Sequence, residues 1–211
     1  EILQTFNQEN GLSSNYIMGI EQDKKGRIIV ATKNGLNIIF SNKIVGQINN
    51  NDGLPGNFSF NVYCDSDNVL WVSSNDGLIR IENDTSIFVF NISNGLFDNS
   101  LYDVLEDDFG FFWFPTDIGI ARISKNQLNA YAKGEEKSYS YRLFTRSDGM
   151  KSNKCIGATK SFKATDGRLF FTTSGGVAIV NPKDLQENES NTDVIFEHII
   201  ADDIQIFPTE N

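Results

Sequence analysis

Short runs that alternate between apolar and polar residues fill most of the chain. Residues 16–40 hold three of them, YIMGIEQD, RIIVAT and GLNIIF, separated by the turn sequences KKG and KNG. A two-residue period with many β-branched and aromatic side chains is typical of β-strands. Glycine and asparagine between the runs tolerate the positive φ angles of tight turns. The pattern therefore predicts short strands joined by tight turns.

This unit of strands is repeated along the chain. Its leading glycines Gly11, Gly53 and Gly95 are 42 residues apart, and Gly149 follows after 54 more. A fourth run, KIVGQI, completes the first unit before the second begins. Four strands in about 42 residues are the unit of a β-propeller blade. We therefore predict an all-β fold with four blades of a β-propeller, in repeats near 10–51, 52–93, 94–147 and 148–182.

Two segments interrupt or leave the repeat. The third unit carries an insertion, and we expect a short helix in it at 124–134, capped by Ser124 and stopped by Gly134. Polar residues at 183–193 predict a linker. Alternation resumes at 194–211, which predicts the first strands of a different sheet domain that the sequence ends before completing.

The order of residues in the first repeat carries a family resemblance. The first repeat has a fixed order of glycine, leucine, asparagine, aspartate and threonine residues, and the second and third repeats keep most of these marked positions. The fourth repeat departs, because Met150 replaces the leucine and the aspartate is lost. Over roughly residues 10–185 this pattern resembles the two-component regulator propeller repeat. The marked positions of the first repeat are Gly11, Leu12, Asn15, Asp23, Gly26, Thr32, Gly35 and Leu36.

The resemblance implies a fold and a function for a larger protein. It implies that the four blades belong to a seven-bladed propeller, followed from 194–211 by a β-sandwich of the Y_Y_Y type. It further implies the periplasmic sensing segment of an inner-membrane hybrid histidine kinase, whose two-component phosphorelay controls transcription. Such regions commonly detect breakdown products of complex polysaccharides, so an oligosaccharide ligand is expected. This chain itself is then not an enzyme.

Composition narrows the choice of partners. The chain has 28 acidic and 18 basic residues and a net charge of -10, so phosphate backbones and anionic membranes should repel it. We expect no contact with nucleic acid, and no direct contact of this segment with the membrane, because no apolar run approaches the roughly 18 residues that span a bilayer. Cys64 and Cys155 could pair, but each stands at an apolar strand position, which favours buried free thiols.

Two other functions are compatible with propeller blades. A docking scaffold for other proteins needs the same blades and differs only in its loops. A sialidase-like glycoside hydrolase is suggested by DFGFFWF from Asp108, although the leading Ser and the Thr of a sialidase Asp-box are absent. The sequence shows no nucleophile pair, nucleotide loop or metal-ligand spacing, and its one histidine is His198. We therefore expect no catalytic residue, no metal and no cofactor.

Ligand recognition should depend on positions that vary between repeats. The recurring glycines, leucines and asparagines, Asn57 among them, are interpreted as turn and packing residues. The residue after each turn asparagine varies, and we expect it to open the strand nearest the propeller axis. Aromatic faces and an ammonium group at that mouth would suit a sugar acid or a sulfated sugar. The predicted ligand-binding residues are Tyr16, Phe58, Ser100 and Lys154.

The number of blades also predicts how the chain associates. Four blades make an arc, so we expect each end to expose an apolar face and an unpaired strand edge, at residues 3–6 and after Val180. A two-fold homodimer would cover these faces. In an intact receptor the remaining blades and the Y_Y_Y domain would cover them instead. The expected face residues include Ile28, Ile38, Phe170 and Phe171.

Overall fold

The chain folds into four antiparallel sheets arranged as consecutive blades of a β-propeller. The computed structural model describes residues 4–56, 58–157, 159–185, 199–201 and 204–207. Each of these four sheets lies inside one predicted repeat, so the predicted fold is confirmed. The strands are β1 (Ile17–Gln22), β2 (Ile28–Thr32), β3 (Gly35–Phe40) and β4 (Lys43–Ile48) in the first blade; β5 (Ser59–Cys64), β6 (Leu70–Ser74), β7 (Leu78–Glu82) and β8 (Ser86–Phe90) in the second; β9 (Leu105–Glu106), β10 (Phe111–Pro115), β11 (Ile120–Ser124) and β12 (Tyr141–Phe144) in the third; and β13 (Phe162–Lys163), β14 (Leu169–Thr173) and β15 (Gly176–Val180) in the fourth.

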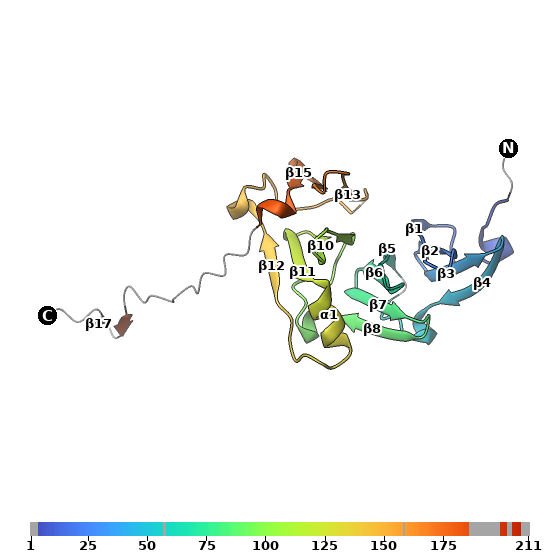
Figure 1. Ribbon diagram of the computed structural model, residues 1–211, viewed down its shortest axis with the longest axis horizontal. Helices are drawn as coiled ribbons and strands as arrows, with labels where there is room; N and C mark the ends of the chain where they lie inside the picture. The colour runs from blue at the N-terminus through green and yellow to red at the C-terminus, as the bar shows by residue number, and fades with distance from the viewer. Residues whose placement is uncertain (1–3, 57, 158, 186–198, 202–203, 208–211) are drawn as a thin grey trace.

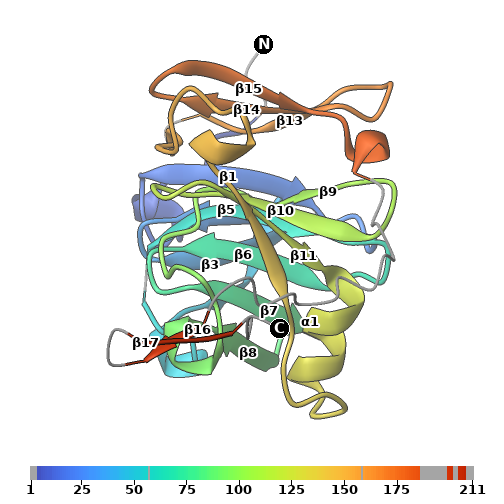
Figure 2. The same ribbon diagram turned by 90° about the vertical axis from the view of Figure 1, so that its left-hand side faces the viewer.

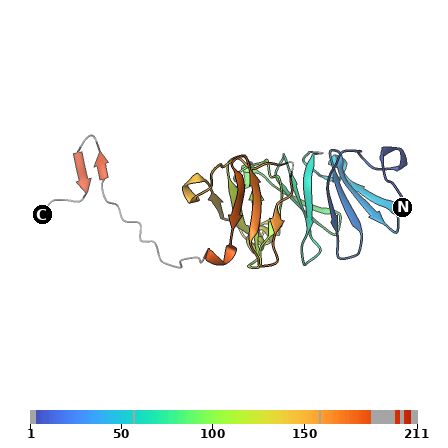
Figure 3. The same ribbon diagram turned by 90° about the horizontal axis from the view of Figure 1, so that it is seen from above.

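The blades follow one another along an arc (Figure 1). Within each sheet the strands pair in chain order, so the first strand lies on the inner side of the arc and the last on the outer side (Figure 1). Seen from above, neighbouring sheets stand beside one another (Figure 3). The inner strands of the first two blades touch, because a Cβ on Gly19 of β1 would lie 2.4 Å from the Asn61 side chain of β5.

A short helical turn leads into each blade, and its end explains the recurring glycines. These one-turn 3-10 helices are η1 (Gln8–Asn10), η2 (Asn50–Asp52), η3 (Ile92–Asn94) and η4 (Arg146–Asp148). All four have a capping box at the start and a glycine with φ between 99° and 115° at the end. Only glycine adopts such angles without strain, so the predicted role of Gly11, Gly53, Gly95 and Gly149 is confirmed.

The turn asparagines also have structural roles. Asn15, Asn99 and Asn153 each accept a hydrogen bond from the first backbone N–H of the preceding 3-10 helix, seven residues earlier, at 2.7–2.9 Å. Their interpretation as turn residues is confirmed, although the backbone that they bond is that of the preceding 3-10 helix and not their own, as we had expected. Asn57 lies outside the described residues. The adjoining leucines Leu12, Leu54 and Leu96 are buried.

Two buried tryptophans hold the turn between the first two strands in place. In the second blade Asp65 accepts hydrogen bonds from the N–H groups of Asp67 and Val69 through one oxygen, and from Trp71 Nε1 through the other. Asp107 and Trp113 repeat the arrangement in the third blade. In the segment DFGFFWF, residues 108–110 therefore form a turn held by the buried Asp107, and the remaining residues belong to β10.

The insertion in the third blade contains the predicted helix, α1 (Lys125–Ala132). Ser124 caps its first turn by accepting from Gln127 N–H, and Gly134, with φ at 74°, follows its end, as predicted. The helix lies beside β8 and β11 (Figure 2). Tyr131 packs on Phe88 and Phe90, and Arg80 Nε donates to Asn129 Oδ1 at 2.7 Å. The helix therefore joins the second and third blades.

The burial of the two cysteines was predicted correctly, whereas the exposure of two apolar residues was not. Cys64 and Cys155 are buried free thiols, as expected. Ile38 and Phe171 are also buried, 5% and 0% exposed, so placing them on the outer faces was wrong; neighbouring strands of their own and adjacent blades already cover them. The exposed apolar residues are instead Ile17, Ile20, Phe40, Val45, Phe162, Val177 and Ile179, among others.

The segment after the fourth blade begins with a 3-10 helix, η5 (Pro182–Asp184). Most of the predicted linker 183–193 lies outside the described residues. Beyond it, β16 (Ile199–Ala201) and β17 (Ile204–Phe207) pair antiparallel. The assignment of 194–211 to a β-sandwich stays a prediction, and His198 lies outside the described residues.

An ion-pair cluster ties the first two blades together and predicts a pH dependence. Arg27 donates from Nη1 and Nη2 to Asp84 at 2.6 and 2.8 Å, and from Nε to the buried Asp23 at 2.6 Å. The hydrogen bonds from Arg27 lower the pKa of Asp84 below its usual range. Because the folded-state pKa lies below the unfolded value of about 3.9, this stabilisation is present above that pH and lost as pH falls.

We expect Asp84→Asn to lower the melting temperature at pH 7, and we expect this difference to shrink as the pH falls below the unfolded pKa of about 3.9. Thermal unfolding at pH 7 and at a series of lower pH values checks this, with the exposed Asp67→Asn as the control. A difference that stays constant as the pH falls would contradict the role given to the Asp84 charge.

Candidate functional site

The four predicted ligand residues lie at the same end of the blades. In an antiparallel sheet the start of the first strand and the turn between the second and third strands share one end. Tyr16 and Phe58 directly precede β1 and β5, as expected. Ser100 and Lys154 stand several residues ahead of β9 and β13, so the expectation that each opens an inner strand was wrong for these two. Next to Lys154, Cys155 forms only an isolated β-bridge with Thr173.

The first pair of predicted residues meets around a lysine. Lys33, in the turn between β2 and β3, holds Nζ 4.2 Å from the ring centre of Tyr16 and 5.8 Å from that of Phe58. In such cation–π contacts, the ammonium group is attracted to the face of the aromatic ring. The Tyr16 side chain remains 64% exposed. The structure therefore brings Tyr16 and Phe58 together and adds Lys33, which the sequence analysis did not select.

The second pair meets around an aspartate. Lys154 Nζ lies 3.8 Å from Asp117 Oδ1, and both side chains are exposed, so this ion pair is weak. The Tyr102 hydroxyl has Asp117 and Ser100 as its hydrogen-bonding neighbours. Burial, followed by the nearby Asp117 carboxylate, raises the pKa of Tyr102 to about 12.

A row of aromatic rings connects the two pairs. Phe58 contacts Phe60 with ring centres 4.9 Å apart, and Phe60 contacts Tyr102 at 5.5 Å, both edge to face. A Cβ on Gly157 would lie 2.6 Å from the Tyr102 ring, so the glycine lets the ring approach the fourth blade. We call this surface the inner rim: Tyr16, Lys33, Phe58, Phe60, Ser100, Tyr102, Asp117 and Lys154.

Beside the inner rim, a hollow of about 190 Å³ is lined by β1 and β5 and by the segments ahead of β9 and β13 in the third and fourth blades. Its floor includes a buried polar chain in which Asn61 Nδ2 donates to Asp103, and Asp103 accepts from Ser161 N–H at 2.7 Å. Gly19, Asn61 and Asp103 occupy the same position in successive repeats, 42 residues apart. Because the residue type at this position changes from repeat to repeat, the sequence alone could have identified the position as a candidate site.

The described residues offer little for metal binding. Across these segments no group of three or more His, Cys, Asp or Glu side chains is placed to hold a metal ion. The inner rim instead combines aromatic faces, two ammonium groups and hydrogen-bonding hydroxyls. Such a surface can stack on flat apolar faces and pair with anions. Whether it binds a ligand stays a prediction.

Comparison with known proteins connects the repeat to a family. The family model "Two component regulator propeller" matches residues 11–34 and 53–76, which run from the glycine that ends each 3-10 helix through the first two strands of the first two blades. The chain contains two-component regulator propeller repeats. No curated protein sequence matches the chain. None of the helices in the described segments is long and apolar enough to cross a membrane.

Solved structures share the fold of these regulator propeller blades. The extracellular domain of BT3049 from B. thetaiotaomicron, described as a hybrid two component system, aligns with a TM-score of 0.73 and 21% identity over 94% of this chain and 26% of that one. The extracellular domain of BT4673 from the same organism, described as a one component system, gives 0.69 and 18% over 87% and 26%. The chain thus spans about a quarter of each of these domains.

An enzyme is also among the structural neighbours. Virginiamycin B lyase from Staphylococcus aureus, in a catalytically inactive H270A form with quinupristin, aligns with a TM-score of 0.55 and 17% identity over 79% of this chain and 55% of that one. At such identity the likeness concerns the fold alone. Function must therefore be argued from the inner rim and from the regulator propeller repeats.

Proposed function

We propose that this chain is part of the extracytoplasmic ligand-sensing region of a membrane-bound two-component sensor histidine kinase that controls transcription. The regulator propeller repeats and the fold shared with extracellular domains of two-component systems support this. The segment would act from the periplasm, with further propeller blades and a Y_Y_Y domain as its neighbours in the whole protein. Signal transfer and kinase chemistry would belong to other parts of that protein.

The observation that carries the proposal is the inner rim itself. It offers an exposed Tyr16 face, with Lys33 beside it, and a second ammonium on Lys154. Carbohydrates present apolar ring faces that stack on aromatic side chains, and acidic sugars add an anion for a lysine. We therefore propose an acidic oligosaccharide released from a polysaccharide as the ligand.

Titration of the chain with two oligosaccharides of equal length, an oligogalacturonate and a cello-oligosaccharide, tests this proposal. We expect the acidic sugar to bind more tightly. Tyr16→Ala and Lys154→Ala should each weaken that binding about tenfold, because one stacking or ionic contact contributes roughly 1.4 kcal/mol. Isothermal titration calorimetry measures both effects.

The matched control is Tyr141→Ala, since Tyr141 is a half-exposed tyrosine on the outer strand β12, far from the inner rim. Unchanged affinity in both rim variants would reject the ligand site. Failure of both sugars to bind, together with selective capture of another protein, would instead favour the docking scaffold.

A further inference from the structure

Two contacts on the inner rim link neighbouring blades in the same way. Lys33, in the turn between β2 and β3, holds Nζ 5.8 Å from the ring centre of Phe58, which precedes β5. Asp117, in the turn between β10 and β11, lies 3.8 Å from Lys154, which stands at the corresponding position of the fourth blade. In both cases the turn residue of one blade meets the residue that follows the turn asparagine of the next blade.

The boundary between the first two blades carries an uncompensated positive charge. The contacts of Lys33 Nζ are with the rings of Tyr16 and Phe58, and among the described residues this lysine forms no ion pair. Asn75 and Ser100, at the same two positions of the next boundary, are both uncharged. An ammonium group on an aromatic face keeps its charge, so Lys33 is available to an anion.

Carboxylates outnumber ammonium groups around the third blade. Asp117 already compensates the charge of Lys154. Beside this pair, Asp98 Oδ1 accepts a hydrogen bond from Ser100 N–H at 3.0 Å, and Asp76 lies in the turn between β6 and β7. In the part of the chain that the structure describes, neither Asp76 nor Asp98 forms an ion pair. The inner rim and its flanks are therefore positive at the first blade and negative at the third.

We propose that the inner rim selects a ligand with one acidic group, held by Lys33, and that Asp117 and Asp98 exclude a second one. This inference rests on the sugar-sensing function proposed above. Specificity often depends on such repulsion of the wrong charge. A neutral sugar residue would lie over the third blade, where carboxylate oxygens accept hydrogen bonds from hydroxyl groups. The ligand class is then an oligosaccharide in which an acidic sugar adjoins a neutral one.

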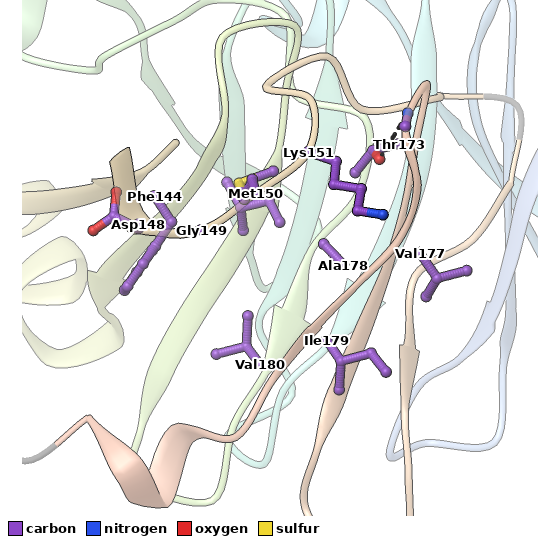
Figure 4. A pocket seen from close by; sticks show the side chains of 12 residues that line it. Phe144, Asp148, Gly149, Met150, Lys151, Thr173, Val177, Ala178, Ile179 and Val180 are labelled. Atoms are coloured by element: carbon purple, nitrogen blue, oxygen red, sulfur yellow. Dashed lines mark hydrogen bonds between the residues drawn. The ribbon is translucent and has the colours of Figure 1, made fainter. Parts of the chain in front are cut away.

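Another hollow near this end of the blades suits such a ligand less well. It is a groove of about 290 Å³ beside β15, lined by apolar side chains such as Met150 and Val180 and by Lys151 (Figure 4). Sugar hydroxyls buried against these walls would lack hydrogen-bond partners, which costs free energy. Lys151 lies beside Gly175, in the turn between β14 and β15. It is therefore a matched control for Lys33, an exposed lysine in the equivalent turn of another blade.

Three disaccharides that differ only in charge test the inference. They are cellobiose and its two forms in which one or both C6 groups are oxidised to carboxylates. By isothermal titration calorimetry at low salt, we expect one carboxylate to tighten binding about three- to fivefold, the range of an exposed ion pair. The doubly oxidised form should bind less tightly than the singly oxidised form. About 0.5 M NaCl should remove these differences, because it screens exposed charges.

Three substitutions of exposed side chains assign the effects to residues. Lys33→Gln should abolish the gain from the first carboxylate. Asp117→Asn should raise the affinity for the doubly oxidised disaccharide at least to that for the singly oxidised one, because it removes a repulsive charge and releases Lys154. Lys151→Gln should leave the order and the ratios of the three affinities unchanged.

The outcomes separate this inference from the proposed function. If Lys33→Gln keeps the gain, or if Lys151→Gln also loses it, Lys33 does not hold the acidic group and the inference is overturned, while sugar binding stands. The inference is also overturned if the second carboxylate tightens binding further in the unmodified chain. Absence of binding by all three disaccharides would count against sugar sensing itself, and this inference would be rejected with it.

Discussion

Replacing Gly77 with alanine should strongly destabilise the chain. The new Cβ would lie 1.9 Å from the Phe90 carbonyl oxygen, a backbone atom that cannot move without separating β7 from β8. The φ of 121° at this position adds backbone strain, which by itself costs about 1–3 kcal/mol. Together we expect a loss of at least ~4 kcal/mol, a large part of the 5–15 kcal/mol that stabilises a typical domain.

The matched control for Gly77→Ala is Gly110→Ala. Gly110 also has a positive φ, of 79°, but no described atom lies within 4 Å of its Cβ site. We expect it to lose only the strain contribution, about 1–2 kcal/mol. Urea unfolding followed by circular dichroism, at one fixed protein concentration, compares the two. Equal losses would mean that the close approach of the outer strand is unimportant.

Removing the Asp65 carboxylate should cost about 3–4 kcal/mol. Three donors, the N–H groups of Asp67 and Val69 and Nε1 of Trp71, would lose their acceptor in a fully buried site. Each buried donor without a partner costs roughly 1–3 kcal/mol. Asp65→Ala should therefore lower the urea midpoint strongly.

The exposed Asp67→Ala provides the control, because it keeps the backbone N–H that Asp65 binds. Its free energy of unfolding should change by no more than about 0.5 kcal/mol. Tryptophan fluorescence reports the same transition, since Trp71 loses its hydrogen bond in Asp65→Ala. A loss below about 1 kcal/mol in Asp65→Ala would show that the turn re-forms without its carboxylate.

Much of the architecture followed from local patterns. The Gly-Leu spacing predicted the four blades because each blade needs the same positive-φ turn before its first strand. The Ser124 and Gly134 positions predicted α1 for a similar reason, since helix ends depend on a few neighbouring residues. The free thiols followed from the apolar strand positions of Cys64 and Cys155.

The candidate site was predictable only in part. Tyr16, Phe58, Ser100 and Lys154 were selected because they vary between repeats, and the structure does place them at one end of the blades. Lys33 was missed because its contact with Tyr16 spans a strand hairpin. The row formed by Phe58, Phe60 and Tyr102 was missed because it crosses from one blade to the next.

By itself, the sequence determined the fold class, the number of blades and the role of the repeated turn residues. These features depend on backbone angles and on burial patterns that a short stretch of chain already contains. Only the tertiary structure decided which apolar residues stay exposed, such as Val177 rather than Phe171, and which glycines face an outer strand. Exposure and close approach depend on what neighbouring strands cover, and those strands come from distant parts of the chain.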